Sequence, residues 1–484
     1  MQKVSVQPHI SESTSTRPKE SKNLLLRYGL DLLVMIAMGV LLYQGLFGQR
    51  FSDVPVYQCY ATAFWGGLPA LKTLPWEQCS FLTQPQDSFI STATLVHWMQ
   101  ANHFPAGIIH FVASQTPNLP LHSLPREYPL PSIIPFTIPL LVSPYWYQVA
   151  FAISMSVVAI IIYGLLRCFR SRWAACTCAL YLVIGGWATA DGRFDLVPSV
   201  LTLVAIIFGV RKRWNWAFAF LALSVVFKFY SLPLLIPFLL AQQLASGEKW
   251  TSWRRFTPLV VFVVVCVAIM VFSLCLSIEG TLAPLSYYGN RPFQVESAAA
   301  SILWLSHFLG YSLDLRYTYG SLSVVSPLTS LVSLINSILL GAGLIYIWWL
   351  QLRNKIDLAA SCLLTLLIVI FTGKVFSPQY VLWFMPLVAY VGERKPKWVV
   401  AWCLFGVLTT YIFPYLYMLF MDNFTSISAT PFFYAIIALR NLCFFCIIAS
   451  LLFSYSYSYL RKKTALVNAQ NKEVKGNGKR KGKG

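Results

Sequence analysis

Apolar stretches of about 20 residues recur along the chain from Leu24 almost to Leu460, separated by short polar or basic segments. A helix of about 20 residues rises roughly 30 Å, which is enough to cross the hydrocarbon core of a bilayer. A transmembrane β-barrel would instead show weak alternation within much shorter strands. The pattern therefore predicts an all-α fold, a polytopic bundle of transmembrane helices.

The first apolar stretch, Leu32 to Phe47, follows a polar, Ser-rich and basic segment. No small-residue cleavage site follows the stretch, so we interpret it as a retained helix and not as a signal peptide. We expect residues 1–27 to form a disordered cytoplasmic leader and residues 28–460 a transmembrane domain. Residues 461–484 are rich in Lys and Gly, and we expect a disordered cytoplasmic tail that is attracted to anionic lipid.

Composition and charge agree with a membrane protein. The chain is 57% hydrophobic and 11% charged, too apolar for a soluble domain of 484 residues. Basic clusters, such as Arg167–Arg172 and Arg394–Lys397, fall between the apolar stretches. If every cluster faces the cytoplasm, the positive-inside rule predicts about twelve crossings with both termini inside. The net charge of +20 then reflects topology, and we expect no nucleic-acid partner.

Three predicted outer segments are too long for simple turns: 48–144, 277–322 and 421–431. Within the first, Phe89 to Phe111 mixes apolar and polar residues, which favours helices lying along the membrane surface. The Pro-rich piece Pro129 to Pro144 is too short to span a membrane and indicates a half-helix. Function is expected in these segments.

Two of the 11 cysteines, Cys59 and Cys79, fall in the first outer loop. A disulfide between them is compatible with an oxidising compartment, but the sequence does not supply the geometry and leaves the pairing open. The other cysteines lie in or beside apolar helices, where burial as small hydrophobic side chains is the simplest interpretation.

An ionisable group beside the hydrocarbon is costly unless it is paired or hydrated, so such groups at the outer ends of the helices are candidates for function. Asp53, a few residues past the first helix, is the candidate general base. The candidate phosphate or sugar ligands are the cations Arg126, Arg193, Lys228, Arg291 and Lys374. The other candidate substrate-binding residues are Glu127, Tyr128, Asp191, Tyr288, Gln294, Glu296, Gln379 and Tyr380.

Structural roles remain open for several of these residues. Asp53 has the position of a helix N-cap, and Arg126 next to Glu127 is also typical of an interfacial ion pair. Asp191, Arg193 and Asp195 would suit caps and salt bridges as well as ligand contacts. Lys228, flanked by apolar residues, needs either an anion or a route to water along its own side chain.

A carboxylate and several cations on one side of a membrane suit an anionic, lipid-embedded substrate such as a polyprenyl-phosphate sugar. The carboxylate would take the proton of an acceptor hydroxyl, which attacks the anomeric carbon in one inverting displacement. The sequence contains no Gly-rich phosphate loop, HExxH, GxSxG or spaced Cys/His set. We therefore predict no cofactor and no dedicated metal site, although carboxylates such as Asp191 leave a divalent cation open.

Six motifs occur in order between about Asp53 and Pro386: SDVPVYQCYA, EYPLP, GRFDLVPSVL, KFYSLPLLIP, NRPFQVES and SPQYVLWFMP. Together they resemble the integral membrane glycosyltransferases of family 87, C-type enzymes similar to polyprenol-phosphate-mannose-dependent α-mannosyltransferases. The resemblance implies a C-type fold, a catalytic carboxylate in the first outer loop, matched by Asp53, and a lipid-phosphate sugar donor. Family members often read Tyr-Pro-Pro where this chain has Tyr128, Pro129 and Leu130.

The function expected from the sequence is transfer of a sugar, mannose by family analogy, from a polyprenyl-phosphate donor to a glycolipid or glycan acceptor at the outer face of the cell membrane. A lipid-linked sugar flippase or other transporter is the alternative, disfavoured by the absence of a visible inverted repeat. A membrane scaffold is a third interpretation, which leaves the isolated outer cations unexplained.

Overall fold

The computed structural model describes residues 24–47, 52–83, 91–247, 249, 252–392, 395–420 and 430–481. The chain is mostly helical, with 78% helix and 3% strand. Of the expected leader, only Leu24 to Arg27 fall within the described residues, and they belong to the first helix. The expected outer segment 421–431 lies almost wholly outside the described residues.

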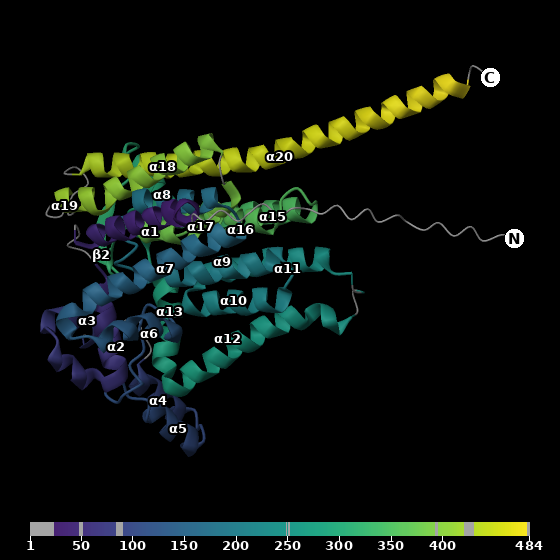
Figure 1. Cartoon of the computed structure of the whole chain (residues 1–484). Coiled ribbons are helices and arrows are strands. Elements are labelled where there is room, and N and C mark those ends of the chain that lie inside the picture. The colour runs from purple at the N-terminus through teal and green to yellow at the C-terminus, as the bar shows by residue number, and fades with distance from the viewer. Residues whose placement is uncertain are drawn as a thin grey trace.

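Six helical spans within the described residues are long and apolar enough to cross a membrane. Two of the spans lie within α1 (Leu24–Phe47) and α20 (Pro431–Lys481), and the others include α7 (Tyr147–Phe169), α12 (Thr257–Leu276), α15 (Thr329–Leu352) and α18 (Pro396–Thr410). The helices run side by side in one bundle (Figure 1). This confirms the prediction of a polytopic helical membrane protein, while the twelve crossings and the C-type fold stay predictions.

Shorter apolar helices pack among the long ones: α8 (Arg172–Gly186), α9 (Leu196–Val210), α10 (Trp214–Phe227), α11 (Leu235–Ala245), α16 (Leu358–Thr372) and α17 (Val381–Gly392). Nearly every residue of α16 and α17 is buried. By contrast, only 11% of the most apolar window of α12 is buried, so its many valines face outward. Helices that are apolar all round and exposed in this way suit contact with lipid.

Small residues allow two of these helices to approach closely. A Cβ atom at Gly185 of α8 would lie 3.1 Å from the Cα of Gly406 on α18. Side chains larger than hydrogen would push the backbones apart, which is the reason that glycine is common where membrane helices meet.

The described residues of the predicted first outer loop form short helices, in agreement with the helices expected there. They are α2 (Val54–Gly66), η1 (Leu68–Thr73), α3 (Trp76–Thr83), α4 (Thr92–Ala101) and α5 (Ala106–Ala113). Helices α4 and α5 cover most of the amphipathic run and project from the bundle (Figure 1). The Pro-rich piece forms η2 (Leu130–Ser132), α6 (Ile133–Thr137) and η3 (Ile138–Leu141), and η4 (Pro144–Trp146) leads into α7.

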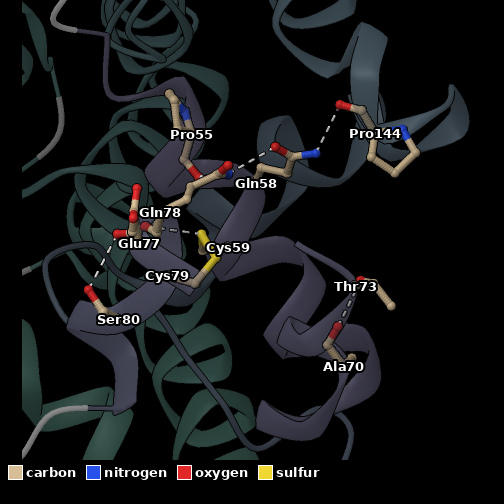
Figure 2. The surroundings of a disulfide bond; sticks show 10 residues. All are labelled: Pro55, Gln58, Cys59, Ala70, Thr73, Glu77, Gln78, Cys79, Ser80 and Pro144. Atoms are coloured by element: carbon tan, nitrogen blue, oxygen red, sulfur yellow. Dashed lines mark hydrogen bonds between the residues drawn. A yellow bond between two sulfur atoms is a disulfide. The ribbon is translucent and has the colours of Figure 1, made fainter. Parts of the chain in front are cut away.

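A disulfide joins Cys59 of α2 to Cys79 of α3, with the two Cα atoms 5.6 Å apart. Figure 2 shows the hydrogen bonds around it. The amide of Gln78 donates to the Pro55 carbonyl and to Gln58, which in turn donates to the Pro144 carbonyl. The helix that begins next to Asp53 is thereby fastened on two sides.

A three-stranded antiparallel sheet is the part of the fold that the sequence analysis, which expected only helices, did not predict. Its order is β1 (Phe293–Gln294), β3 (Ser321–Val325) and β2 (Asp314–Thr318). Helices α13 (Ile278–Asn290) and α14 (Ala298–His307) flank β1 in sequence. Phe293 and Val324 belong to an apolar cluster that also contains Phe433 and Ile437, so the sheet and α20 share one core.

The C-terminal segment also differs from the expectation. Instead of lacking regular structure from residue 461, the backbone of α20 stays helical to Lys481 and extends beyond the bundle (Figure 1). The buried part of α20 supplies the helix nucleus, and adding residues to a formed helix avoids the nucleation cost.

Candidate functional site

A cavity of about 720 Å³ lies where several connections between the helices meet the small sheet. Its volume is within the range of about 300–1,000 Å³ that is typical of small-molecule sites. Eleven of the fourteen candidate residues line it: Asp53, Glu127, Tyr128, Arg193, Lys228, Tyr288, Arg291, Gln294, Glu296, Gln379 and Tyr380. The cavity thus brings together segments that lie far apart in the sequence.

Asp53 stands directly before α2, in the N-cap position, but its side chain does not cap the helix. The hydroxyl of Ser52 accepts the hydrogen bond from the Val54 amide instead. The Asp53 carboxylate is therefore released from helix capping and forms an ion pair with Arg193 while facing the cavity.

Lys228, at the C-terminal end of α10, finds its anion within the protein. Its ammonium nitrogen donates to Asp195 at 2.7 Å, and the indole of Trp383 donates to the same carboxylate oxygen. The ammonium also lies 5.0–5.5 Å from the ring centroids of Tyr128, Phe194 and Trp383. Aromatic faces attract a cation, so Lys228 is stabilised as a charge at the cavity wall.

Arg291, which follows α13, has spare donor capacity. Its Nη2 donates to the Ser321 hydroxyl at 2.8 Å, and the guanidinium lies 5.5 Å from the centre of the Tyr287 ring. The buried Nε has no hydrogen-bond partner, and among the described residues no carboxylate forms an ion pair with Arg291. An unpaired guanidinium in a cavity is suited to bind a phosphate.

Glu127 and Tyr128 occupy the loop before the half-helix. The Glu127 side chain is half-buried at the cavity surface, and burial raises the pKa of its carboxyl group. The nearby charges of Arg291 and Lys228 act in the opposite direction. Tyr128 packs edge-on against Phe194, within a cluster of aromatic rings behind the cavity.

A second cavity of about 320 Å³ adjoins the first. The two share the lining residues Lys228, Tyr288, Arg291, Val375 and Tyr380, and most of the remaining lining of the second cavity is apolar. Lys374, the candidate cation missing from the main cavity, lines this one and donates to the Gly289 carbonyl. A charged cavity and a mostly apolar one thus meet at Lys228 and Arg291.

Three candidate residues at the cavity surface have side-chain oxygens that already accept hydrogen bonds from other parts of the protein. Gln294 accepts a hydrogen bond from the Phe376 amide, so that it joins β1 to the loop before α17. Both carboxylate oxygens of Glu296 are occupied, by Tyr417 and by Arg440. Gln379 accepts from the Ser377 hydroxyl.

Two further candidate residues are not in the main cavity. Arg126 donates to the carbonyls of Phe81 and Leu82 at the end of α3, which are orphan acceptors of that helix. Asp191 is buried and accepts a hydrogen bond from Ser156 of α7 at 2.9 Å. Their roles in the structure are to hold backbone and helices together.

Sequence reasoning considered Asp195 for a cap, a salt bridge or a ligand contact without identifying it as the partner of Lys228, and it did not single out Arg440 as the partner of Glu296. Asp195 belongs to the GRFDLVPSVL motif, and the need of Lys228 for an anion was the signal that pointed to it. Arg440 lies in an apolar helix, where a buried charge is itself a signal of a partner. No cluster of three or more His, Cys, Asp or Glu side chains arranged for a metal ion occurs among the described residues.

No protein-family model matches the sequence, and no curated protein matches it either. Membership of family 87 is therefore a prediction from the sequence motifs, and the function has to be inferred from the cavity itself.

Proposed function

We propose that the protein is an inverting membrane glycosyltransferase of the C type, similar to family 87, that uses a polyprenyl-phosphate sugar as donor. The observation that carries this proposal is the meeting of the Asp53 carboxylate with Arg193, Lys228 and Arg291 in one cavity. Isolated ionisable groups next to hydrocarbon are expensive, and their concentration in a cavity is typical of functional sites.

The adjoining cavity supports a lipid-linked donor. Arg291 and Lys228 stand on the wall that the two cavities share, where a phosphate would lie. The apolar remainder of the second cavity, which includes Val369, Ile370 and Trp383, would accommodate the first isoprene units. A soluble nucleotide sugar has no lipid tail that would bind in such an apolar cavity.

In the proposed reaction the Asp53 carboxylate takes the proton from the acceptor hydroxyl. The hydroxyl oxygen forms a bond to C1 of the donor sugar as the bond from C1 to the phosphate oxygen breaks, and the polyprenyl phosphate leaves with the electron pair. Arg291 and Lys228 stabilise the charge on the departing phosphate. A single displacement inverts the anomeric centre. Arg193 orients the carboxylate.

The acceptor is a glycolipid or glycan, and we place the site on the outer face of the cell membrane with both termini in the cytoplasm. The Cys59–Cys79 disulfide, which lies close to Asp53 in the sequence, suits an oxidising compartment. Mannose is the sugar that family analogy favours, for a product of the cell envelope.

Reconstituted vesicles test this function against the flippase alternative. The donor is polyprenyl-phosphate mannose labelled in the sugar, and a lipid extract supplies acceptors. If the protein is a glycosyltransferase, the label enters a new glycan while polyprenyl phosphate accumulates. Intact donor moving to the opposite leaflet, with no new glycan formed, would replace the glycosyltransferase by a transporter.

A further inference from the structure

Strands β2 and β3 are joined by a two-residue turn, because Thr318 pairs with Ser321. The turn residues Tyr319 and Gly320 both have positive φ angles, 52° and 64°. Asn, Asp and Gly are the usual residues in such turns, and a bulky side chain with positive φ is strained. A tyrosine held in this conformation points to a requirement for its ring at that place.

Alternate residues of β2 lie on one face of the strand. Leu315 and Tyr317 therefore point to the same side, and Tyr319 follows in the turn. All three line the main cavity, whereas Asp314 and Arg316 do not. The hairpin is therefore a wall of the cavity, with its charged residues directed away.

The two tyrosines differ in how tightly they are held. The Tyr287 hydroxyl donates to the Tyr319 carbonyl at 2.6 Å, and the two rings meet edge to face with centroids 5.3 Å apart. Tyr317 is 77% exposed, and among the described residues no other ring contacts it. Since Tyr317 lines the cavity and is still open to solvent, it stands at the mouth.

We propose that Tyr317 and Tyr319 form a stacking site for the acceptor glycan, an inference that rests on the proposed glycosyltransferase function. The apolar face of a pyranose ring packs on an aromatic ring, and the hairpin residues that line the cavity carry no charge, which suits a neutral sugar. The cationic part of the cavity, with Lys228 and Arg291, is where the donor phosphate binds. The acceptor enters through the aqueous mouth, past Tyr317, to reach Asp53.

Two measurements on the full-length protein in nanodiscs test the stacking site. The first is steady-state kinetics, with acceptor and donor varied separately, for Tyr317→Ala and for Tyr317→Trp, which keeps an aromatic face. Arg316→Ala, on the opposite face of the same strand, is the matched control. We expect Tyr317→Ala to raise the acceptor KM by about three- to tenfold, the size of one aromatic contact. The donor KM stays unchanged, and Tyr317→Trp restores the acceptor KM.

The second measurement is saturation-transfer NMR with a panel of soluble disaccharides, which reports binding without any transfer. We expect a signal with wild type and Arg316→Ala and its loss in Tyr317→Ala. An unchanged acceptor KM in Tyr317→Ala would overturn the stacking site while Asp53-dependent transfer upheld the enzyme. Tyr317-dependent binding of a disaccharide without transfer from any polyprenyl donor would leave the sugar site standing and reject the glycosyltransferase. If wild type gives no disaccharide signal, the sugar site is rejected, and Tyr317 is only an aromatic residue at the membrane interface.

Discussion

The ammonium of Lys228 lies 2.7 Å from the carboxylate of Asp195, and the two side chains are 6% and 1% exposed. Two charges buried this completely stabilise each other only as a pair, since either alone would face a low-dielectric surrounding. The pair holds the C-terminal end of α10 against the N-terminal end of α9, next to the rings of Tyr128, Phe194 and Trp383. The ion pair therefore holds the Lys228 ammonium in a fixed place at the cavity wall.

Replacing Asp195 by Asn should destabilise the protein by about 3–5 kcal/mol, because Lys228 is left as an unpaired buried charge. Thermal unfolding in detergent measures the loss. Asp314→Asn is the control, because its pair with Arg316 is exposed and surface pairs contribute roughly 0–1 kcal/mol. Equal stability of Asp195→Asn and wild type would show that the buried pair is not needed.

The raised pKa of Glu127 leads us to expect that donor binding depends on pH. Burial raises the pKa of this carboxyl group, so its neutral form persists to higher pH than in an ordinary glutamate. Below that pKa, the neutral carboxyl group of Glu127 does not compete with the donor phosphate for Arg291 and Lys228. As pH rises through it, the new carboxylate competes for the same cations, and donor affinity should fall by roughly three- to tenfold.

The variant Glu127→Gln should remove this dependence and keep donor affinity high across the range. Donor binding measured by calorimetry from pH 4 to pH 9 would follow it, with Glu77→Gln as an exposed glutamate control. A wild-type affinity that rises with pH, or a pH dependence that survives in Glu127→Gln, contradicts the assigned competition.

Arg440 of α20 and Glu296 after β1 form a second buried pair, 0% and 1% exposed. Arg440 also donates to the Glu296 carbonyl, and Asn441 donates there as well. Arg440→Met should cost about 3–5 kcal/mol by leaving Glu296 unpaired. The double variant Arg440→Met, Glu296→Met should recover part of that loss in thermal unfolding. Additive losses would mean that the two residues do not interact.

The sequence predicted the segments of the site better than the contacts within it. Asp53, Arg193, Lys228 and Arg291 stand in connections between apolar stretches, and alternate connections of an antiparallel bundle meet at one end. The positions of these charged residues in the connections were sufficient to predict that they lie near one another. Whether a side chain points inward cannot be deduced from charge alone, and Arg126 instead holds the end of α3.

The contacts that were missed are non-local. Glu296 and Arg440 are 144 residues apart, and nothing in the apolar stretch around Arg440 indicates its partner. The hairpin was missed for a different reason. Its strands have five residues each, and the pattern around Tyr319 and Gly320 was interpreted as part of a polar outer loop.

The Cys59–Cys79 disulfide should stabilise the first outer segment. The bonded residues are separated by 20 positions, and closing a loop of about this length is worth about 3 kcal/mol. The paired variant Cys59→Ser, Cys79→Ser should unfold at lower temperature and transfer sugar more slowly, since α2 carries Asp53 at its start. Cys168→Ser, at an exposed free cysteine, is the control. Free thiols at both positions in the native protein would remove this role.

The most direct test of the central claim is the rate of sugar transfer by Asp53→Asn compared with wild type, measured with polyprenyl-phosphate mannose and a lipid-extract acceptor. An amide oxygen at position 53 can still accept a hydrogen bond from Arg193, so the loop is kept while the base is lost. We expect kcat to fall by about 100- to 10,000-fold with donor binding retained. Sugar transfer by Asp53→Asn at the wild-type rate would show that Asp53 is not the general base.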